Sequence, residues 1–136
     1  MMKPKELMLG DWVSVKTALG ERITTVQELY QTGIITKEGG PFLHDEISPI
    51  PLTHDILHKN EITLIAVGDD GVLTPKKDRN RFEKWLIHTR WKDAFLWYDR
   101  LTKRWSFHGL SGRTFTYVHQ LQHALNFAEI EKEIEL

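Results

Sequence analysis

The sequence has no cysteine and no long run of apolar residues, and both absences narrow what the chain can be. Without cysteine there is no disulfide and no thiolate nucleophile, and a metal ion would need histidine and carboxylate ligands. The longest apolar segment, around Ile62–Val67, has the length of a strand rather than of a membrane-spanning helix. The first residues, MMKPKELMLGDW, lack the apolar run and the cleavage site of a signal peptide. We therefore expect a soluble cytoplasmic protein, which the lack of cysteine also fits.

A net charge of −1 over 136 residues hides two unequal parts of the chain. Residues 76–113 carry eleven Lys and Arg against four Asp and Glu, so this stretch has a charge of +7 and the remainder −8. The same stretch holds four of the five tryptophans, which are Trp85, Trp91, Trp97 and Trp105. This basic and aromatic stretch predicts either a binding surface or a β-sheet with an ordinary solvated face.

The first fifty residues are typical of short strands separated by turns. Strands are expected at residues 12–15, 22–29, 33–36 and 42–50, with a Gly-Gly-Pro turn before the last. Short strands at this spacing indicate a small barrel, and Leu9–Val15 (LGDWVSV) looks like the first strand of SH3-like barrels. We therefore predict an N-terminal SH3-like β lobe over residues 1–52.

The remainder, residues 53–136, is expected to form a second domain. After the proline-rich connector Ser48–Leu52, Thr53 is a suitable N-cap for a short helix that ends near Asn60. Aromatic strands at 82–89, 92–100 and 104–108 predict an antiparallel β-meander, whose middle strand is apolar on both faces and is expected to be covered on both.

The end of the chain predicts a helix that packs on this meander. Val118, Leu121, Leu125 and Ala128 form an amphipathic stripe, while the Glu-rich last eight residues are expected to fray. The fold class is therefore α+β: an SH3-like lobe, a short linking helix, and a β-meander packed against a C-terminal helix.

Three segments together resemble a family of small uncharacterised proteins found in Bacteroidetes genomes and in their prophages. They are Leu7–Val13 (LMLGDWV), Pro49–Thr53 (PIPLT) and Tyr117–Gln122 (YVHQLQ). Residues 61–80 depart from the pattern of that family, and a Glu/Ile repeat replaces its glycine-containing ending. The resemblance implies an intracellular protein of mobile-element origin. It implies no known activity, so no catalytic residue is carried over.

Two histidine pairs have the spacing of metal ligands on one helical face. They are His54/His58 and His119/His123, each within an expected helix. Neither pair is completed by the Glu of a His-Glu-x-x-His motif, and the sequence provides no defined third ligand. Ordinary helix histidines are the simpler interpretation, and a metal-dependent enzyme is kept as a third alternative. We assign no catalytic, cofactor-binding or metal-binding residue.

The basic and aromatic stretch is the main candidate for a functional surface. Nucleic-acid binding needs cations for phosphates and, for single strands, exposed rings for stacking. Trp91 is expected to be exposed because it lies in a turn between two strands, and a fully buried Trp91 would exclude stacking. The candidate partner-binding residues are Lys76, Lys77, Arg79, Arg81, Lys84, Arg90, Trp91, Lys92, Arg100 and Arg104.

These patterns favour a non-enzymatic binding module that presents a basic, partly aromatic surface to nucleic acid or to an acidic protein. The alternative is a structural or assembly protein of a mobile element or phage. In that case the acidic part of one copy would meet the basic part of another in a homo-oligomer. Neither a membrane partner nor a cofactor is expected.

Overall fold

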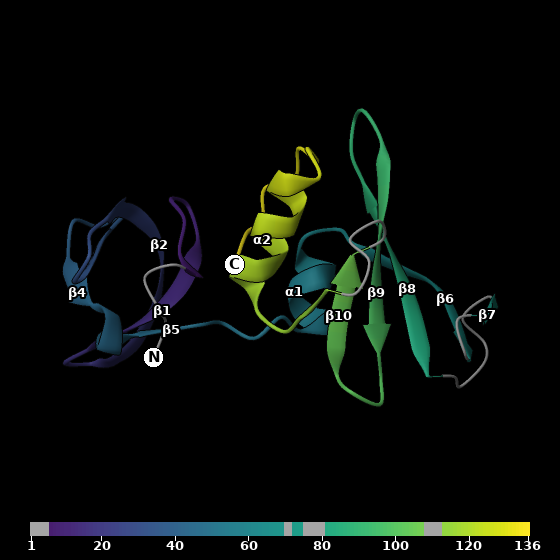
Figure 1. Cartoon of the computed structure of the whole chain (residues 1–136), viewed down its shortest axis with the longest axis horizontal. Coiled ribbons are helices and arrows are strands. Elements are labelled where there is room, and N and C mark those ends of the chain that lie inside the picture. Colours follow the sequence, from purple (N-terminus) through teal and green to yellow (C-terminus); the bar gives the residue numbers. More distant parts are fainter. Residues whose placement is uncertain (1–5, 70–71, 75–80, 108–112) are drawn as a thin grey trace. The chain divides into compact units, whose positions relative to one another are not determined.

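The computed structural model describes residues 6–69, 72–74, 81–107 and 113–136. Within these residues the chain forms two antiparallel sheets and two α-helices, which confirms the predicted α+β class (Figure 1). Neither of these helices is long and apolar enough to span a membrane. The chain divides into two compact units: the first unit holds Met1–Pro51 and Tyr117–His123, and the second holds Leu52–Thr116 and Ala124–Leu136.

The first unit is built on a curled five-stranded sheet of order β4-β3-β2-β1-β5 (Figure 1). Its strands are β1 (Trp12–Thr17), β2 (Gly20–Leu29), β3 (Gly33–Thr36), β4 (Pro41–Leu43) and β5 (Ile47–Ser48). The long β2 pairs with both β1 and β3, and a bulge between Val26 and Glu28 bends it where the partner changes. Alternate apolar side chains point inward and form a core of Leu7, Val13, Val15, Val26, Ile34 and Ile47.

The prediction of a single strand over residues 42–50 is wrong. A short 3-10 turn, His44–Glu46, separates β4 from β5. The Glu46 carboxylate accepts a hydrogen bond from the Leu43 backbone N–H at 2.9 Å, and after this turn the chain pairs with β1 through β5. A local side-chain acceptor therefore ends the strand where alternation alone would have continued it.

The second unit begins with helix α1 (His54–Lys59), as predicted. The Ile56 backbone N–H donates to the Thr53 hydroxyl at 3.3 Å, so Thr53 is the N-cap. Leu57 is fully buried, which supplies the packing that so short a helix needs.

The second unit contains a six-stranded sheet of order β11-β10-β9-β8-β6-β7, of which Figure 1 labels β10, β9, β8, β6 and β7. Its strands are β6 (Thr63–Asp69), β7 (Val72–Thr74), β8 (Phe82–His88), β9 (Asp93–Asp99), β10 (Arg104–Phe107) and β11 (Thr114–Phe115). Strands β8, β9 and β10 form the predicted meander, with β9 in the middle.

The two faces of the β9 strand differ, contrary to the expectation that both would be covered. Ala94 and Leu96 are buried, whereas Phe95 and Trp97 on the opposite face are only half-buried. The buried face of the sheet also carries Trp85, which packs against histidines of α1. We call the opposite face, which carries Phe82, Lys84, Phe95 and Trp97, the outer face of the second unit.

Helix α2 (Val118–Phe127) carries three members of the predicted apolar stripe, since Val118, Leu121 and Leu125 are all buried, whereas Ala128 follows the helix and is half-buried. Its residues are divided between the units: Val118–His123 group with the first and Ala124–Phe127 with the second.

The expectation that the last eight residues fray is wrong. Ile130 and Ile134 are buried, and the side chain of the buried Asn60 bonds the backbone of Glu135. Asn60 Nδ2 donates to the Glu135 carbonyl at 2.8 Å, and Asn60 Oδ1 accepts from its N–H at 2.7 Å. Burial of the two isoleucines offsets the conformational entropy that this polar segment loses when it is ordered. The bonds to Glu135 also satisfy the buried Asn60 amide, which would be destabilising without a partner.

Candidate functional site

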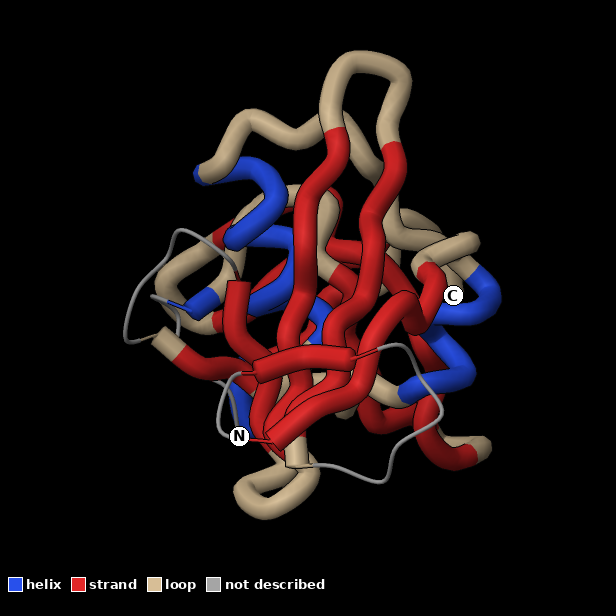
Figure 2. The backbone as a smooth tube through the Cα atoms, turned by 90° about the vertical axis from the view of Figure 1, so that its right-hand side faces the viewer, coloured by secondary structure: helices blue, strands red, loops and turns tan. Residues whose placement is uncertain are grey.

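The turn between β8 and β9 exposes the aromatic residue expected there. Trp91 is 71 % exposed, and the Arg90 guanidinium carbon lies 4.9 Å from the centre of its ring. The Thr89 hydroxyl accepts from the Lys92 backbone N–H at 3.1 Å, and the Thr89 N–H donates to the Lys92 carbonyl. These bonds brace the turn, which stands clear of the neighbouring strands (Figures 1 and 2). We call Arg90, Trp91 and Lys92 the hairpin tip.

The outer face of the second unit combines aromatic rings with one central cation. Lys84 Nζ lies 4.0 Å from the centre of the Phe95 ring and 5.4 Å from that of Trp97. Lys84 and Trp97 are opposite each other in the β8–β9 register, so the contact follows from strand pairing. These distances are those of cation–π interactions. The Lys84 charge therefore lies over the rings and not beside them.

Two of the predicted cations are held by carboxylates. Arg81 donates to both oxygens of Asp99, at 2.8 Å each, in a bidentate pair across the hairpin. The Arg81 hydrogen bonds hold the pKa of Asp99 well below its usual range. Arg100 donates from Nε to Glu83 Oε2 at 2.8 Å, toward the buried face of the sheet. Their positive charges are therefore largely balanced.

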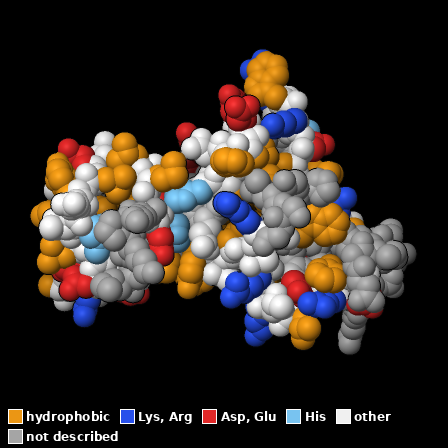
Figure 3. Space-filling model, in the orientation of Figure 1, with side chains coloured by type: hydrophobic (Ala, Val, Ile, Leu, Met, Phe, Trp, Pro, Cys, Tyr) orange, Lys and Arg blue, Asp and Glu red, His pale blue; other side chains and the backbone are white. Residues whose placement is uncertain are grey.

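The structure thus distributes the predicted site residues over several places. Arg90, Trp91 and Lys92 share the hairpin tip, although Lys92 Nζ also donates to the Ala128 carbonyl at 3.0 Å. Lys84 lies on the outer face, and the exposed Arg104 donates to the Thr114 hydroxyl at 3.3 Å. Figure 3 shows Lys and Arg side chains spread over the part that holds β8–β10, with acidic side chains between them. Lys76, Lys77 and Arg79 lie outside the described residues.

Glu83, whose side chain is only 7 % exposed, was not among the residues predicted from the sequence. Its Oε1 lies 2.9 Å from His54 Nε2 and accepts from Trp85 Nε1 at 2.8 Å, while its Oε2 pairs with Arg100. Burial by itself would raise the pKa of Glu83, but the bonds from Arg100, Trp85 and His54 outweigh it and lower the pKa. Strand periodicity could have indicated the burial of Glu83. Glu83 and Trp85 are two residues apart in one strand, so their side chains point to the same, inward face.

Aromatic rings surround this carboxylate. The His54 ring lies 5.3 Å from that of Trp85, 5.0 Å from that of Tyr98 and 5.5 Å from that of Trp105, between centres. Burial raises the pKa of Tyr98, and the charge of Glu83 adds to this effect. Glu83 thus orients His54 and Arg100, whose side chains are 44 % and 39 % exposed.

The second histidine pair lies in the first unit, where the two rings have different roles. His123 Nε2 lies 2.7 Å from Asp11 Oδ2, and Asp11 also accepts from the Met8 N–H at 2.9 Å. His119 is buried, with its ring centre 5.5 Å from that of His123. In the described part of the chain, no group of three or more His, Asp and Glu side chains is placed to hold a metal ion.

We expect His119 to make the protein less stable in mild acid. Burial lowers the pKa of His119, so the unfolded chain binds a proton at a higher pH than the folded chain does. The stability is complete above the unfolded pKa, about 6.5, and falls as the pH drops toward the folded pKa. Urea denaturation at pH 7.5 and 5.5 should show a smaller loss for His119→Phe than for the wild type. Equal losses would contradict this role of His119.

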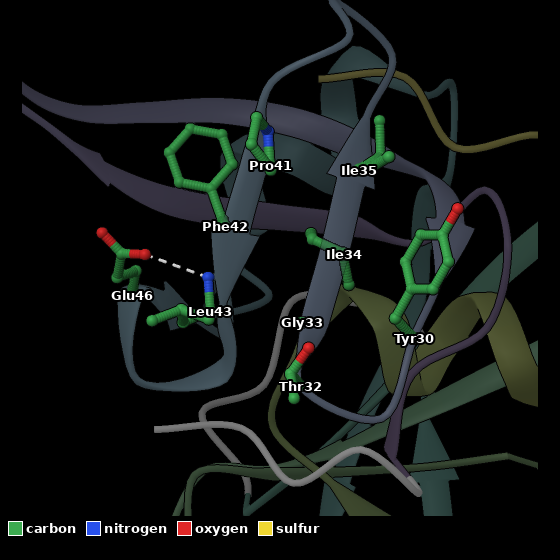
Figure 4. Close-up of a pocket in the computed structure, with 9 residues that line it drawn as sticks. All are labelled: Tyr30, Thr32, Gly33, Ile34, Ile35, Pro41, Phe42, Leu43 and Glu46. Carbon is green, nitrogen blue, oxygen red and sulfur yellow. Dashed lines mark hydrogen bonds between the residues drawn. The ribbon is translucent and has the colours of Figure 1, made fainter.

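A pocket of about 320 Å³ opens beside β3 and β4 in the first unit (Figure 4). Its walls are mainly apolar, and the Glu46 carboxylate lies at one side, where it bonds the Leu43 N–H. The volume is at the lower end of the roughly 300–1,000 Å³ of ligand pockets. The lining residues are Tyr30, Thr32, Gly33, Ile34, Ile35, Pro41, Phe42, Leu43 and Glu46.

Comparison with known proteins found no match for this chain among family models, curated proteins or solved structures. The resemblance to a Bacteroidetes and prophage family therefore stays a prediction.

Proposed function

We propose that the protein is a non-enzymatic module that binds single-stranded nucleic acid along the β8–β9 hairpin. The observation that carries the proposal is the exposed Trp91 ring at the hairpin tip, next to the Arg90 guanidinium. A base stacks on an exposed ring whatever its sequence, and a guanidinium beside the ring reaches the adjacent phosphate. The expected binding is therefore tolerant of sequence and sensitive to salt.

The outer face supports the same proposal in a second way. Phe95 and Trp97 are half-buried rings on the β9 strand, and Lys84 lies over both. A phosphate can pair with Lys84 while the neighbouring base covers the ring edges. Arg81 and Arg100 are expected to contribute less, because each already pairs with a carboxylate.

We further propose that the first unit is an SH3-like barrel and that the protein acts in the cytoplasm. Five antiparallel strands that curl around one apolar core support the barrel assignment. A mobile-element origin fits the three sequence segments that suggested it. An acidic protein is the other partner class that the charged hairpin admits.

Substitution of Trp91 by alanine should weaken oligonucleotide binding by roughly 5- to 100-fold, since one stacked base contributes about 1–3 kcal/mol. Fluorescence anisotropy with a labelled single-stranded oligonucleotide, at low and moderate salt, measures this. Phe127→Ala is the matched control, because Phe127 is a 78 % exposed ring of the same unit outside the hairpin. It should bind as the wild type does. No wild-type binding at low salt would reject the nucleic-acid proposal.

A further inference from the structure

The pocket of the first unit has no role in the proposed function, although its surroundings expose apolar surface. Tyr30 and Leu43, which line it, are 53 % and 55 % exposed, and the neighbouring Leu29 is also exposed. Phe42 and Ile35 are half-buried in its wall. Several apolar side chains gathered around one pocket mark an interaction site, because scattered single residues would not create such a patch.

Acidic groups outnumber cations around the pocket. Glu46 is part of the lining, and Glu28 lies 3.3 Å from the Tyr30 hydroxyl through its Oε1. The described residues of the first unit carry seven Asp and Glu against three Lys and Arg. Of these cations, Arg22 lies 5.8 Å from the centre of the Phe42 ring. An apolar pocket with acidic groups at its edge selects a ligand that is apolar at its centre and cationic beside it.

The chain itself carries a group of this chemistry at the hairpin tip. Trp91 is a large exposed ring, and Arg90 and Lys92 flank it. The braced turn and the Arg90–Trp91 contact mean that little order has to be gained when the tip binds. Exposed tryptophan and arginine are the residue types that most often dominate protein interfaces.

We propose that the hairpin tip of one copy docks into the first-unit pocket of a second copy. Trp91 enters beside the Leu43 side chain, and Arg90 pairs with Glu46. The Glu46 carboxylate has capacity for this bond, since an ionised carboxylate accepts about four hydrogen bonds and one comes from Leu43. The contact joins two different surfaces, so a pair of copies still has one free tip and one free pocket, and further copies can add.

Self-association should therefore depend on protein concentration and weaken as salt is added, because the Arg90–Glu46 pair is near the surface. Sedimentation of the full chain at micromolar and near-millimolar concentration measures this. Loss of one central tryptophan anchor should weaken association by about thirtyfold or more. Trp91→Ala and Leu43→Lys should therefore both sediment as monomers where the wild type associates.

Mixing these two variants gives the decisive result. Trp91→Ala retains an intact pocket and Leu43→Lys retains an intact tip, so an equimolar mixture should form one-to-one dimers and nothing larger. A mixture that stays monomeric, or a Trp91→Ala variant that associates like the wild type, would overturn the proposal. Leu19→Lys is the matched control for the added charge, because Leu19 is fully exposed in the β1–β2 turn. It should associate as the wild type does.

Failure of this inference is distinguishable from failure of nucleic-acid binding. Leu43→Lys changes the pocket alone, so it should leave oligonucleotide affinity unchanged while it abolishes self-association. An oligonucleotide that covers the hairpin tip should dissociate the assembled copies. Equal urea midpoints and circular dichroism for the wild type and each variant establish that loss of association is not loss of fold.

Discussion

Replacement of Glu83 by leucine should lower the free energy of unfolding of the second unit by about 2–4 kcal/mol. Loss of one partner of a buried ion pair costs about 3–5 kcal/mol when the other stays buried. Here Arg100 and His54 are partly exposed and regain water, which reduces that cost. Trp85 is buried, and its indole N–H would be left without the Glu83 acceptor, at about 1–3 kcal/mol.

Urea denaturation followed by tryptophan fluorescence measures this loss, because Trp85 and Trp105 are buried in the second unit. Glu133→Leu is the matched control, since Glu133 is an exposed carboxylate of the same unit and should change stability by less than about 0.5 kcal/mol. Glu83→Gln keeps the shape and an acceptor, so its effect should be intermediate. If Glu83→Leu and Glu133→Leu were equally stable, the network would have no stabilising role.

The Glu83 network also predicts how acid acts on the second unit. Its hydrogen bonds lower the pKa of Glu83 in the folded state, despite burial. A carboxylate with a lowered folded pKa contributes stability that is complete above its unfolded pKa, about 4.3, and is lost as the pH falls through the folded value. Glu83→Gln should therefore flatten the stability curve on the acid side of that pH.

Replacement of Gly33 by alanine should separate β3 from β4 and destabilise the first unit by about 1–3 kcal/mol or more, as overpacking does. A Cβ at Gly33 would lie 2.0 Å from the Phe42 carbonyl oxygen and 2.9 Å from the Phe42 carbonyl carbon. Both are backbone atoms of β4, so a rotamer change cannot relieve the overlap. Since β4 forms part of the pocket wall, the substitution should also change the shape of the pocket.

Gly40→Ala is the matched control for this effect. A Cβ at Gly40 would lie 3.2 Å from Cε2 of the Phe42 ring, and that ring can turn aside, so the change should cost less than about 1 kcal/mol. Amide hydrogen exchange at Ile34 and Phe42, which are partners in the β3–β4 register, reports this strand pair directly. If amide exchange were as slow in Gly33→Ala as in the wild type, β4 would be able to move away from the new methyl group with no loss of stability.

The local features were the ones that sequence predicted well. The Thr53 cap, the α1 helix and the strands β8 to β10 follow from side-chain chemistry and alternation within a few residues. Trp91 was expected to be exposed because a turn between two strands leaves its central residue without a neighbour, and it is exposed. Errors arose where a distant partner decided the outcome, as at the C-terminal segment, which Asn60 holds.

In the candidate surface, too, local features could be predicted, whereas contacts between distant residues could not. Phe82 and Lys84 share one face of β8, as strand alternation requires. The pairing of Arg81 with Asp99 depends on the register of β8 and β9 and joins residues far apart in the chain. For this reason the sequence overstated the free positive charge: a count of cations takes no account of carboxylates brought close by folding.

The sequence by itself determined the α+β class, the concentration of cations and tryptophans in residues 76–113, and the exposed turn at Trp91. These properties depend on composition and on contacts within a few residues. Only the tertiary structure decided that His54 and Arg100 meet the inward-facing Glu83, that residues 118–123 group with the first unit, and that a pocket lies beside β4. Each of these depends on strand register and packing between distant segments, which side-chain periodicity along one segment does not encode.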